Sequence, residues 1–353
     1  MRRLCIVLLA AVLLLTACAG EKPPADGGGR AVGVSMPTTE RQRWNQDGGH
    51  MKTRLEKMGY HVELRYAQDN PQLQARQIGE MIDQGCEVLV VAAVDGAELV
   101  SVLDRARSMG IPVVAYDRLI LNSDAVRYYA TFDSYDVGVK QANTVVDALE
   151  LNRAEAQYRI EFITGDPEDP NIRLLYDGAM SVLKPYLDSG VLVCPSGMTE
   201  LEQITTDGWS TKKAKARFEK LLADFYTEQP LHAVLAANDS TASGVVQAME
   251  GKNLAFCPVL TGQDCDLEAV QNILSGKQTM SVFKDTRILA EKTAEMVDAL
   301  MRGVEPPVND TKSYDGGSGP IPTYLCKSQV VTAKNAKKVL VDSGYYTGDQ
   351  LDS

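Results

Sequence analysis

The stretch Ile111-Pro-Val-Val-Ala-Tyr-Asp117-Arg118 decides how the rest of this chain can be arranged. An apolar run that leads directly into an aspartate and an arginine is typical of a strand buried on both faces of a parallel sheet. In open α/β sheets, ligands bind just beyond the carboxyl ends of such strands. A carboxylate beside a five-donor guanidinium suits a ligand rich in hydroxyl groups. A surface ion pair that ends the strand is the simpler alternative, and this stretch alone leaves both open.

Strand and helix patterns alternate on both sides of this stretch. Further strands are predicted in the first half at 31–36, 61–66, 87–94 and 126–133, and helices at 42–58, 70–84 and 96–109. The alternation starts again at residue 137 and continues to residue 301. Parallel strands need helical crossovers, so we predict an α/β protein with two doubly wound parallel sheets and a ligand cleft between the halves. An α+β fold with antiparallel strands would need hairpin turns, of which the sequence shows few.

Composition and motifs limit the classes of function. The chain has 353 residues, of which 44% are hydrophobic and 24% charged, and its net charge of -11 offers no basic face for a nucleic acid. It contains no P-loop, GxSxG, HExxH or G-x-G-x-x-G motif, and its three histidines are scattered. Carboxylates are plentiful, so a glycosidase pair stays open as an enzymatic alternative. Arg118, however, would hold Asp117 ionised and make it a poor general acid.

The first 30 residues predict an export signal and a tether. An apolar run at 6–15 follows two arginines and is too short for a comfortable transmembrane helix. Leu15-Thr16-Ala17-Cys18 is similar to the bacterial lipobox, so residues 1–17 are predicted as a lipoprotein signal peptide and Cys18 as the lipidated residue; an ordinary secretory signal is the alternative. Residues 18–30 are rich in Pro and Gly and predict a lipid-anchored tether. The protein is therefore expected outside the cytoplasm, held at a membrane in the periplasm or on the outer face of the cell.

The remaining cysteines predict no metal site. Apart from Cys5 in the signal and Cys18, they are Cys86, Cys194, Cys257, Cys265 and Cys326, and none forms a CxxC or a metal-type cluster. Buried apolar positions are expected for Cys86, Cys194 and Cys326. The odd number leaves at least one free thiol, and disulfide pairing stays open.

Polar and aromatic side chains recur where the predicted strands of both halves end. They are Arg43, Trp44, Asp117, Arg118, Asn171, Trp209, Asn238, Asp264 and Lys284. Such a set suits a sugar, because charged and amide groups can bind its hydroxyl edges and tryptophan rings can cover its C–H faces. Each residue alone has a simpler role, such as a solvated helix residue, a core tryptophan or a helix cap. Their matching positions together favour a binding site.

Segments over nearly the whole mature chain are typical of one known family. They are ERxRW (40–44), AYDRLI (115–120), YYATFD (128–133), DGAMSVLKPY (177–186), DGW (207–209), AND (237–239), TGQD (261–264), VFKDTR (282–287) and VDSGYY (341–346). In this order and spacing they resemble the type I periplasmic sugar-binding proteins of bacterial ABC transporters, especially the xylose-binding and multiple-sugar-binding proteins.

The resemblance implies two Rossmann-like lobes joined by a three-crossing hinge, with sugar bound between them by the nine residues named above. It also implies an N-terminal lobe at 31–131 and 285–316 and a C-terminal lobe at 132–284 and 317–353. The loop that usually has Asp-Asn-Asn in this family has Asp169-Pro170-Asn171 here. Ala-Asn-Asp at 237–239 is closer to the xylose-binding branch and Phe-Lys-Asp-Thr-Arg at 283–287 to the multiple-sugar branch, so the sugar stays open.

The resulting hypothesis is a lipid-anchored solute-binding protein without cofactor or enzymatic activity. It would capture a monosaccharide, D-xylose or a glucose- or galactose-like aldopyranose, by hinge closure. A monomer would then deliver the sugar to an ABC permease, with a sensor kinase or a chemoreceptor as a further partner. The alternatives are a surface sugar-active enzyme similar to a glycoside hydrolase, or a sugar sensor that partners a kinase or a chemoreceptor.

Overall fold

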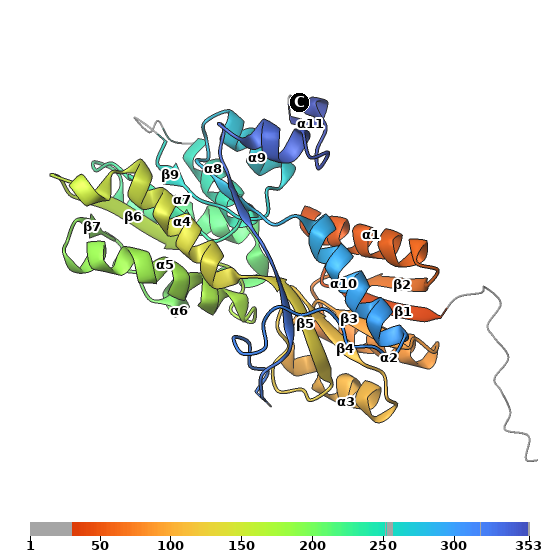
Figure 1. Cartoon of the computed structure of the whole chain (residues 1–353). Coiled ribbons are helices and arrows are strands. Elements are labelled where there is room, and N and C mark those ends of the chain that lie inside the picture. Colours follow the sequence, from red (N-terminus) through yellow and green to blue (C-terminus); the bar gives the residue numbers. More distant parts are fainter. Residues whose placement is uncertain (1–29, 251, 253–256, 318, 352–353) are drawn as a thin grey trace, which may run out of the picture.

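The computed structural model describes residues 30–250, 252, 257–317 and 319–351. The predicted signal peptide, the predicted lipidated Cys18 and residues 18–29 of the predicted tether lie outside these ranges. Within them, no helix combines the length and the apolar character that a membrane span requires. Figure 1 shows the described chain as two lobes of strands and helices, one on each side of a set of connecting segments.

The first lobe is built on a parallel sheet with the strand order β11-β5-β4-β3-β1-β2. The strands are β1 (Ala31–Met36), β2 (His61–Tyr66), β3 (Val88–Val91), β4 (Val113–Tyr116), β5 (Val126–Phe132) and β11 (Thr323–Cys326). The helices are α1 (Gln42–Lys57), α2 (Pro71–Asp83), α3 (Val100–Ser108) and α10 (Thr286–Met301), with a 3-10 turn η1 (Ala97–Leu99) before α3. The order reverses between β1 and β3, which is where such sheets bind ligands.

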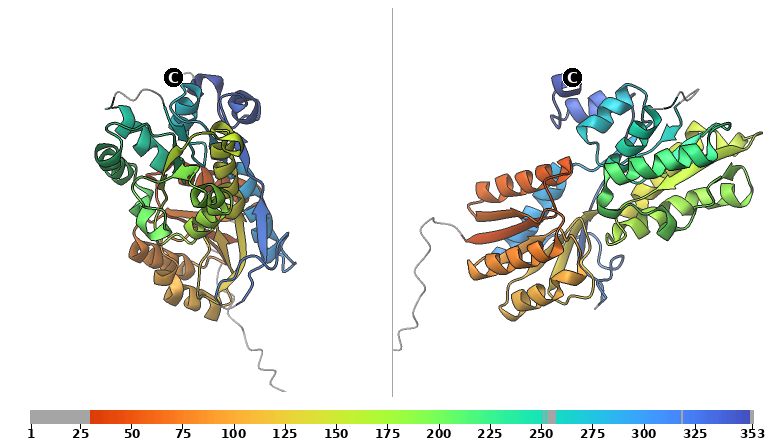
Figure 2. Two further views of the ribbon diagram at one scale, coloured as in Figure 1. Left: turned by 90° about the vertical axis from the view of Figure 1, so that its left-hand side faces the viewer. Right: turned by 180° about the vertical axis from the view of Figure 1, so that it is seen from behind.

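Helices cover both faces of this sheet. On one face, α1 and α10 lie side by side although they are far apart in the sequence (Figures 1 and 2). Leu55 and Leu289 from these helices pack against Val32 and Val34 of β1 in a fully buried core. A second core on the opposite face contains Ile78 of α2 and further apolar residues of α3 and the strands. The continuous apolar runs of the strands are therefore explained by burial on both faces.

The second lobe repeats this plan with the strand order β7-β6-β8-β9. The strands are β6 (Tyr158–Ile163), β7 (Leu192–Val193), β8 (Ala233–Ala236) and β9 (Val259–Leu260). The helices are α4 (Ser134–Ala148), α5 (Asn171–Asp188), α6 (Leu201–Ile204), α7 (Thr211–Phe225), α8 (Asp239–Glu250) and α9 (Leu267–Leu274), with 3-10 turns η2 (Leu151–Arg153) and η3 (Asp207–Trp209). β10 (Ser281–Phe283) and β12 (Gln329–Val331) form a small antiparallel pair, followed by η4 (Lys337–Val341) and α11 (Gly348–Leu351).

A buried carboxylate lies inside the second lobe, away from any crossing between lobes. Glu161 on β6 is 1% exposed, and its oxygens accept hydrogen bonds from the Ser196 hydroxyl at 2.6 Å and the Tyr226 hydroxyl at 2.7 Å. The Ser196 backbone N–H donates at 3.2 Å and the Cys194 thiol at 3.5 Å. We call Glu161, Cys194, Ser196 and Tyr226 the Glu161 cluster.

The described chain passes between the lobes at three places. These are the connections from β5 to α4, from β10 to α10 and from β11 to β12.

The predicted α/β class with parallel sheets in two lobes is confirmed. The assignment of all of 317–353 to the second lobe is wrong, because β11 pairs with β5 in the first sheet. Residues 323–331 contain two short strands, β11 and β12, which belong to different sheets although they lie close together in the sequence. The rest of the predicted division stays a prediction.

Candidate functional site

The nine side chains that the sequence predicts as ligand contacts all line one cavity between the lobes. It encloses about 450 Å³ of space, its open mouth included. The loops after β1, β4, β6, β8 and β9 meet here, as expected for the carboxyl ends of parallel strands. The predicted residues along its wall are Arg43, Trp44, Asp117, Arg118, Asn171, Trp209, Asn238, Asp264 and Lys284. The structure therefore groups the predicted set in space, while its role in binding stays a prediction.

Asp117 follows β4 directly and has a left-handed backbone, with φ at 58°. Its carbonyl oxygen accepts hydrogen bonds from the Tyr129 hydroxyl at 2.6 Å, the Thr131 hydroxyl at 3.1 Å and Asn171 Nδ2 at 2.8 Å. An aspartate rarely adopts this conformation, which persists where the surrounding structure enforces it. The enforced turn leaves the carboxylate of Asp117 beside Arg43 at the cavity wall.

Arg43, Asp117, Asp264 and Lys284 form a set of buried ion pairs that we call the interlobe charge network. Arg43 Nη2 lies 2.9 Å from Asp117 Oδ1, and Arg43 Nη1 lies 3.2 Å from Asp264 Oδ1. Lys284 Nζ lies 3.0 Å from Asp264 Oδ1 and 3.6 Å from Asp117 Oδ1. Each of the four side chains is 7% exposed or less. Because Arg43 belongs to the first lobe and Asp264 to the second, this network joins the lobes at the cavity.

Asp47 and Tyr116 hold Arg43 in place from behind the cavity wall. Asp47 lies one helical turn after Arg43 on α1, and its Oδ2 is 3.1 Å from both Nε and Nη2 of the guanidinium. The Tyr116 hydroxyl donates to the other oxygen of Asp47. Burial raises the pKa of Asp47 to about 6, although Arg43 opposes this shift. The orientation of Arg43 is thus set before any ligand arrives.

The charges of the network stabilise one another. Burial alone would raise the pKa of Asp117, but the charges of Arg43 and Lys284 outweigh it and lower this pKa to about 2. Burial acts to lower the pKa of Arg43, but the carboxylates of Asp117 and Asp47 raise it well above its ordinary value. Asp117 therefore stays ionised at neutral pH and acts as a pure hydrogen-bond acceptor.

A second ion pair crosses the cavity beside the network. Arg118 Nε lies 2.9 Å from Asp169 Oδ2, and both side chains are almost fully buried. Arg118 Nη1 donates to the Ala93 carbonyl oxygen at 2.9 Å, at the end of the neighbouring strand β3. Arg118 is thus fixed on its own lobe and reaches the loop that follows β6 in the other.

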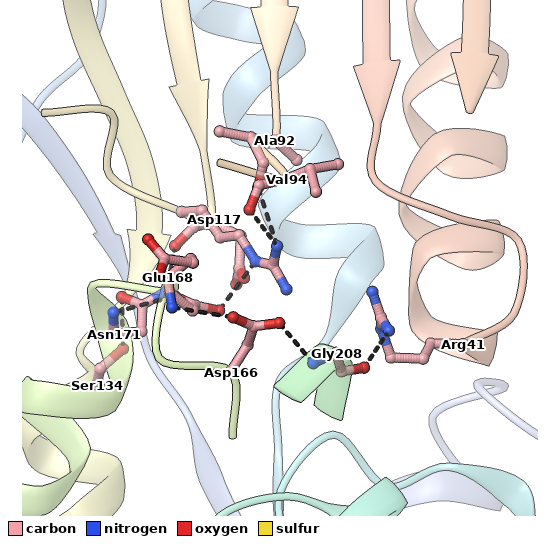
Figure 3. Close-up of polar contacts among 12 residues, drawn as sticks. Arg41, Ala92, Val94, Asp117, Ser134, Asp166, Glu168, Asn171 and Gly208 are labelled. Carbon is pink, nitrogen blue, oxygen red and sulfur yellow. Dashed lines mark hydrogen bonds and ion pairs between the residues drawn. The ribbon is translucent and has the colours of Figure 1, made fainter. Parts of the chain in front are cut away.

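The two asparagines combine cavity and structural roles. Asn171 is the first residue of α5, directly after Pro170, and its Oδ1 accepts from the Ser134 hydroxyl at 3.1 Å (Figure 3). Asn238 Oδ1 accepts from the Thr241 backbone N–H at 3.0 Å. The simpler alternative of a helix cap is therefore correct for Asn238, which caps α8 and lines the cavity as well.

Both tryptophans lie at the cavity and in a core. Trp44 is 2% exposed, and the guanidinium carbons of Arg43 and Arg118 lie 4.5 Å and 5.4 Å from its ring. Trp209 is 6% exposed and has φ at 54°. Its ring covers Gly165 so closely that a Cβ added at Gly165 would lie 2.2 Å from the ring atoms. Glycine at this position therefore allows the indole to lie flat against the loop after β6.

The cavity lining also includes residues that are not among the nine predicted contacts. They are Arg41, Ser134, Asp169, Leu175, Ser240, Gln263 and Asp266. Five of them lie within two residues of a predicted contact: Arg41 before Arg43, Asp169 before Asn171, Ser240 after Asn238, and Gln263 and Asp266 around Asp264.

Arg41 forms a bridge from the first lobe to the second. Its Nη1 donates to the Gly208 carbonyl oxygen at 2.8 Å, and the Gly208 N–H donates to Asp166 Oδ2 at 2.5 Å (Figure 3). Arg41 Nη2 is also paired with Asp69 Oδ1 at 2.5 Å on its own lobe. The sequence signal that could have found it is its place within the segment 40–44.

Metal and thiol chemistry find no support in the part of the chain that the structure describes. There, no group of three or more His, Cys, Asp or Glu side chains is placed to hold a metal ion. Cys86, Cys265 and Cys326 are buried, Cys194 is partly buried and Cys257 is exposed, each as a free thiol. The cavity instead offers hydrogen-bonding groups and aromatic faces.

Comparisons with known proteins agree with this architecture. A family model described as "Periplasmic binding protein domain" matches residues 32–305. The chain is 44% identical to the multiple sugar-binding periplasmic receptor ChvE of Rhizobium radiobacter over 324 residues, which cover 91% of this chain and 92% of ChvE. It is 32% identical to the D-xylose-binding periplasmic protein of Escherichia coli K12 over 320 residues, covering 91% and 92% of the two chains.

A solved structure shows the same similarity in three dimensions. It is an ABC transporter solute-binding protein from Clostridium phytofermentans with bound β-D-glucose. The two structures superpose with a TM-score of 0.90 at 52% sequence identity, covering 91% of this chain and 99% of the other. Architecture, family model and relatives agree that this chain belongs to the periplasmic binding protein family.

Proposed function

We propose that this protein captures an aldopyranose, D-xylose or a glucose- or galactose-like sugar, in the cavity between its lobes. The observation that carries this proposal is the convergence of Asp117, Asp264 and Lys284 with two tryptophans from the two lobes around one cavity. Fixed carboxylates accept from sugar hydroxyls, while the ammonium and guanidinium groups donate to them. The indole rings offer apolar faces to the C–H groups of a pyranose.

The proposed contacts would give selectivity as well as affinity. Each hydroxyl that is left unpaired in a closed site costs about 1–3 kcal/mol. Because Asp117 is held by three hydrogen bonds to its carbonyl oxygen, it can shift little to meet a misplaced hydroxyl. A sugar with one inverted centre is therefore expected to bind about tenfold or more weakly.

The similar proteins support this class of ligand. ChvE is named as a receptor for multiple sugars and the Escherichia coli protein as a D-xylose-binding protein, and the Clostridium phytofermentans protein contains bound β-D-glucose. All three match this chain over at least 91% of its length. They support pyranoses with five or six carbons as the first ligands to test.

Capture would proceed by hinge closure about the three crossings. Three interlobe contacts that opening would break are Arg43 with Asp264 at 3.2 Å, Arg118 with Asp169 at 2.9 Å and Arg41 with the Gly208 carbonyl at 2.8 Å. In the open form these groups are solvated and free to meet a sugar. Closure then replaces water by the ligand and by the facing lobe.

The proposed location and partners follow from the amino-terminal segment. Cleavage before Cys18 and lipidation of its sulfur would hold the protein at a membrane surface, where it would deliver sugar to an ABC permease. A sensor kinase or a chemoreceptor is the further partner in this proposal. Changing Cys18 to Ala should move the protein from the membrane fraction to the soluble extracytoplasmic fraction. Unchanged membrane retention of this variant would contradict the anchor.

A calorimetric screen tests the binding proposal directly. The mature protein is titrated with D-xylose, D-glucose, D-galactose, L-arabinose and D-ribose. Binding of at least one aldopyranose, with a raised thermal midpoint at saturation, is the expected result. Absence of both heat and thermal shift with every sugar would overturn the proposal.

A further inference from the structure

The four cations that line the cavity are all neutralised by carboxylates of the protein. The pairs are Arg41 with Asp69 at 2.5 Å, Arg43 with Asp117 at 2.9 Å, Arg118 with Asp169 at 2.9 Å and Lys284 with Asp264 at 3.0 Å. Arg43 is paired with Asp47 as well. An anionic ligand entering this cavity would have to compete with a carboxylate that is already in place. The donors can still serve a neutral hydroxyl, which adds no charge.

The cavity contains a further carboxylate, that of Asp266, which is not part of the ion pairs named above. Its residue lines the cavity two positions after Asp264. Its Oδ1 is buried and has no hydrogen-bond partner among the residues that the structure describes. A buried polar atom without a partner is uncommon in a native structure and calls for an explanation, such as a ligand.

The backbone around Asp266 is built to hold this carboxylate in place. Asp264 and Cys265 both have left-handed backbones, with φ at 98° and 56°. The Cys265 N–H donates to the Ser281 hydroxyl at 3.0 Å, and the Asp266 N–H donates to Asp239 Oδ2 at 2.9 Å. Two consecutive residues in this conformation bring Asp264 and Asp266 to the same cavity.

The surroundings of Asp266 contain charges of both signs. Burial and the charge of Asp264 raise the pKa of Asp266 to about 7, although Arg43 opposes the shift. The groups that face it from the packed elements are Asp264 on its own turn, Asp239 on α8, Arg43 on α1, Lys284 after β10, Glu268 on α9 and Tyr346 in the carboxyl-terminal segment. Near neutral pH, therefore, Asp266 exchanges between an ionised acceptor and a protonated form.

We propose that Asp266 is a further ligand contact, which accepts a hydrogen bond from a sugar hydroxyl and makes the cavity select neutral aldoses over uronates. This inference rests on the proposed sugar-binding function and specifies its substrate class. An ionised Asp266 repels a ligand carboxylate in a cavity whose cations are already paired. A neutral sugar meets no such repulsion and supplies the donor that Oδ1 lacks.

The test compares sugars that differ only at C6, which is a hydroxymethyl group in the neutral sugar and a carboxylate in the uronate. The mature protein is titrated by calorimetry with D-glucose and D-glucuronate, and with D-galactose and D-galacturonate as a second pair. At about pH 8 the uronate of each pair should bind roughly 100-fold more weakly than the neutral sugar. Between about pH 8 and about pH 5.5 this ratio should fall roughly tenfold, because Asp266 becomes protonated while the uronate stays ionised.

Three variants assign the effect to Asp266. In Asp266→Asn, the ratio of affinities at about pH 8 should fall roughly tenfold and lose its dependence on pH. Asp124→Asn removes the same charge from an exposed position on the first lobe, where Asp124 pairs with Arg107, and should leave both the ratio and its pH dependence unchanged. Asp47→Asn should keep the pH dependence of the ratio, since Asp47 lies behind Arg43 and outside the cavity lining.

The outcomes separate the inference from the function on which it rests. Equal affinities for the neutral sugar and the uronate in the wild type would overturn the proposed preference for neutral sugars. An unchanged ratio of these affinities in a folded Asp266→Asn variant would overturn the role of Asp266. If that variant does not fold, a ratio in the wild type that does not change with pH overturns the inference alone. Failure of every neutral sugar to bind would instead overturn the proposed function.

Discussion

The interlobe charge network and the Glu161 cluster both bury carboxylates, but they satisfy them with different partners. Glu161 receives hydrogen bonds from neutral hydroxyl, amide and thiol groups of its own lobe. Asp117 and Asp264 are instead paired with cations, and the pairs extend across both lobes. A buried carboxylate needs compensation in either case, because removing it from water is expensive.

The difference shows that a buried charge can either keep the same partners permanently or exchange them when the lobes move. Glu161 keeps its partners whatever the angle between the lobes, because they all move with it. The partners of Asp264 include Arg43 of the other lobe, which hinge opening would remove. Charged groups hydrate well when they separate, so the network can exchange protein partners for water or for sugar hydroxyls. Four substitutions would break or sharpen this contrast.

The largest effect is expected from Asp117→Asn. Asparagine tolerates the left-handed backbone of this position, so the turn should remain. Loss of the charge leaves Arg43 and Lys284 with Asp264 as the one carboxylate of the network that they share, and sugar affinity should fall about 100-fold, or about 3 kcal/mol. Calorimetric titration measures the change, with the exposed Asp124→Asn as the control. Unchanged affinity would show that the network is structural only, like the Glu161 cluster.

Trp209→Ala should have the second largest effect on binding. The loss of an apolar face over the sugar should weaken every aldopyranose about 10- to 50-fold, or about 1.5–2.5 kcal/mol. Gly165→Ala should act in the same direction, because its Cβ would displace the Trp209 ring. If binding of all sugars survives Trp209→Ala unchanged, Trp209 belongs to the core alone.

Tyr226→Phe tests the Glu161 cluster. It removes one donor from Glu161, and the free energy of unfolding in urea should fall by about 1–2 kcal/mol. Sugar affinity should stay within about twofold, since no partner of Glu161 crosses to the other lobe. Tyr186→Phe is the matched control, because its hydroxyl donates to Asn152 at an exposed site. A large loss of sugar affinity in Tyr226→Phe would contradict the proposed difference between the interlobe charge network and the Glu161 cluster.

The smallest effect is expected from Asp47→Asn, which should change how the free energy of unfolding depends on pH. The pKa of Asp47 is raised to about 6 in the folded protein, so the folded state binds a proton that the unfolded state releases. Stability therefore rises as pH falls, and Asp47 alone should contribute about 1 kcal/mol between about pH 7 and about pH 5. Urea unfolding at a series of pH values should show this slope in the wild type and a flatter one in Asp47→Asn. Equal slopes would contradict the assignment.

Strand ends were the most informative part of the sequence. Asp117, Asn238 and Asp264 were found because apolar runs stop there, and parallel sheets bring such positions to one edge. The fold class, the periplasmic binding protein family and the expectation of a binding protein rather than an enzyme are confirmed. The simpler alternative of a core residue is correct for Trp44 and Trp209, and each also lines the cavity, while their role in sugar binding stays a prediction.

What the sequence could not show depends on contacts between distant segments. Asp266 reaches the cavity because the two residues before it, Asp264 and Cys265, have left-handed backbones, and no local sequence pattern predicts this conformation. The contact between Arg41 and Gly208 depends on how the lobes meet. Glu161 has the alternating place of an exposed residue in a strand, and only the packing of Ser196 and Tyr226 shows why it is buried.

The position of β11 affects the order in which the chain can fold during synthesis. This strand completes the first sheet beside β5, yet it is made only when residue 326 has left the ribosome. Until then β5 presents an unpaired edge, the kind of surface at which nascent chains join one another. The first lobe therefore cannot mature before most of the second has been synthesised. A chain that stops before β11 should be prone to aggregation even though most of both lobes is present.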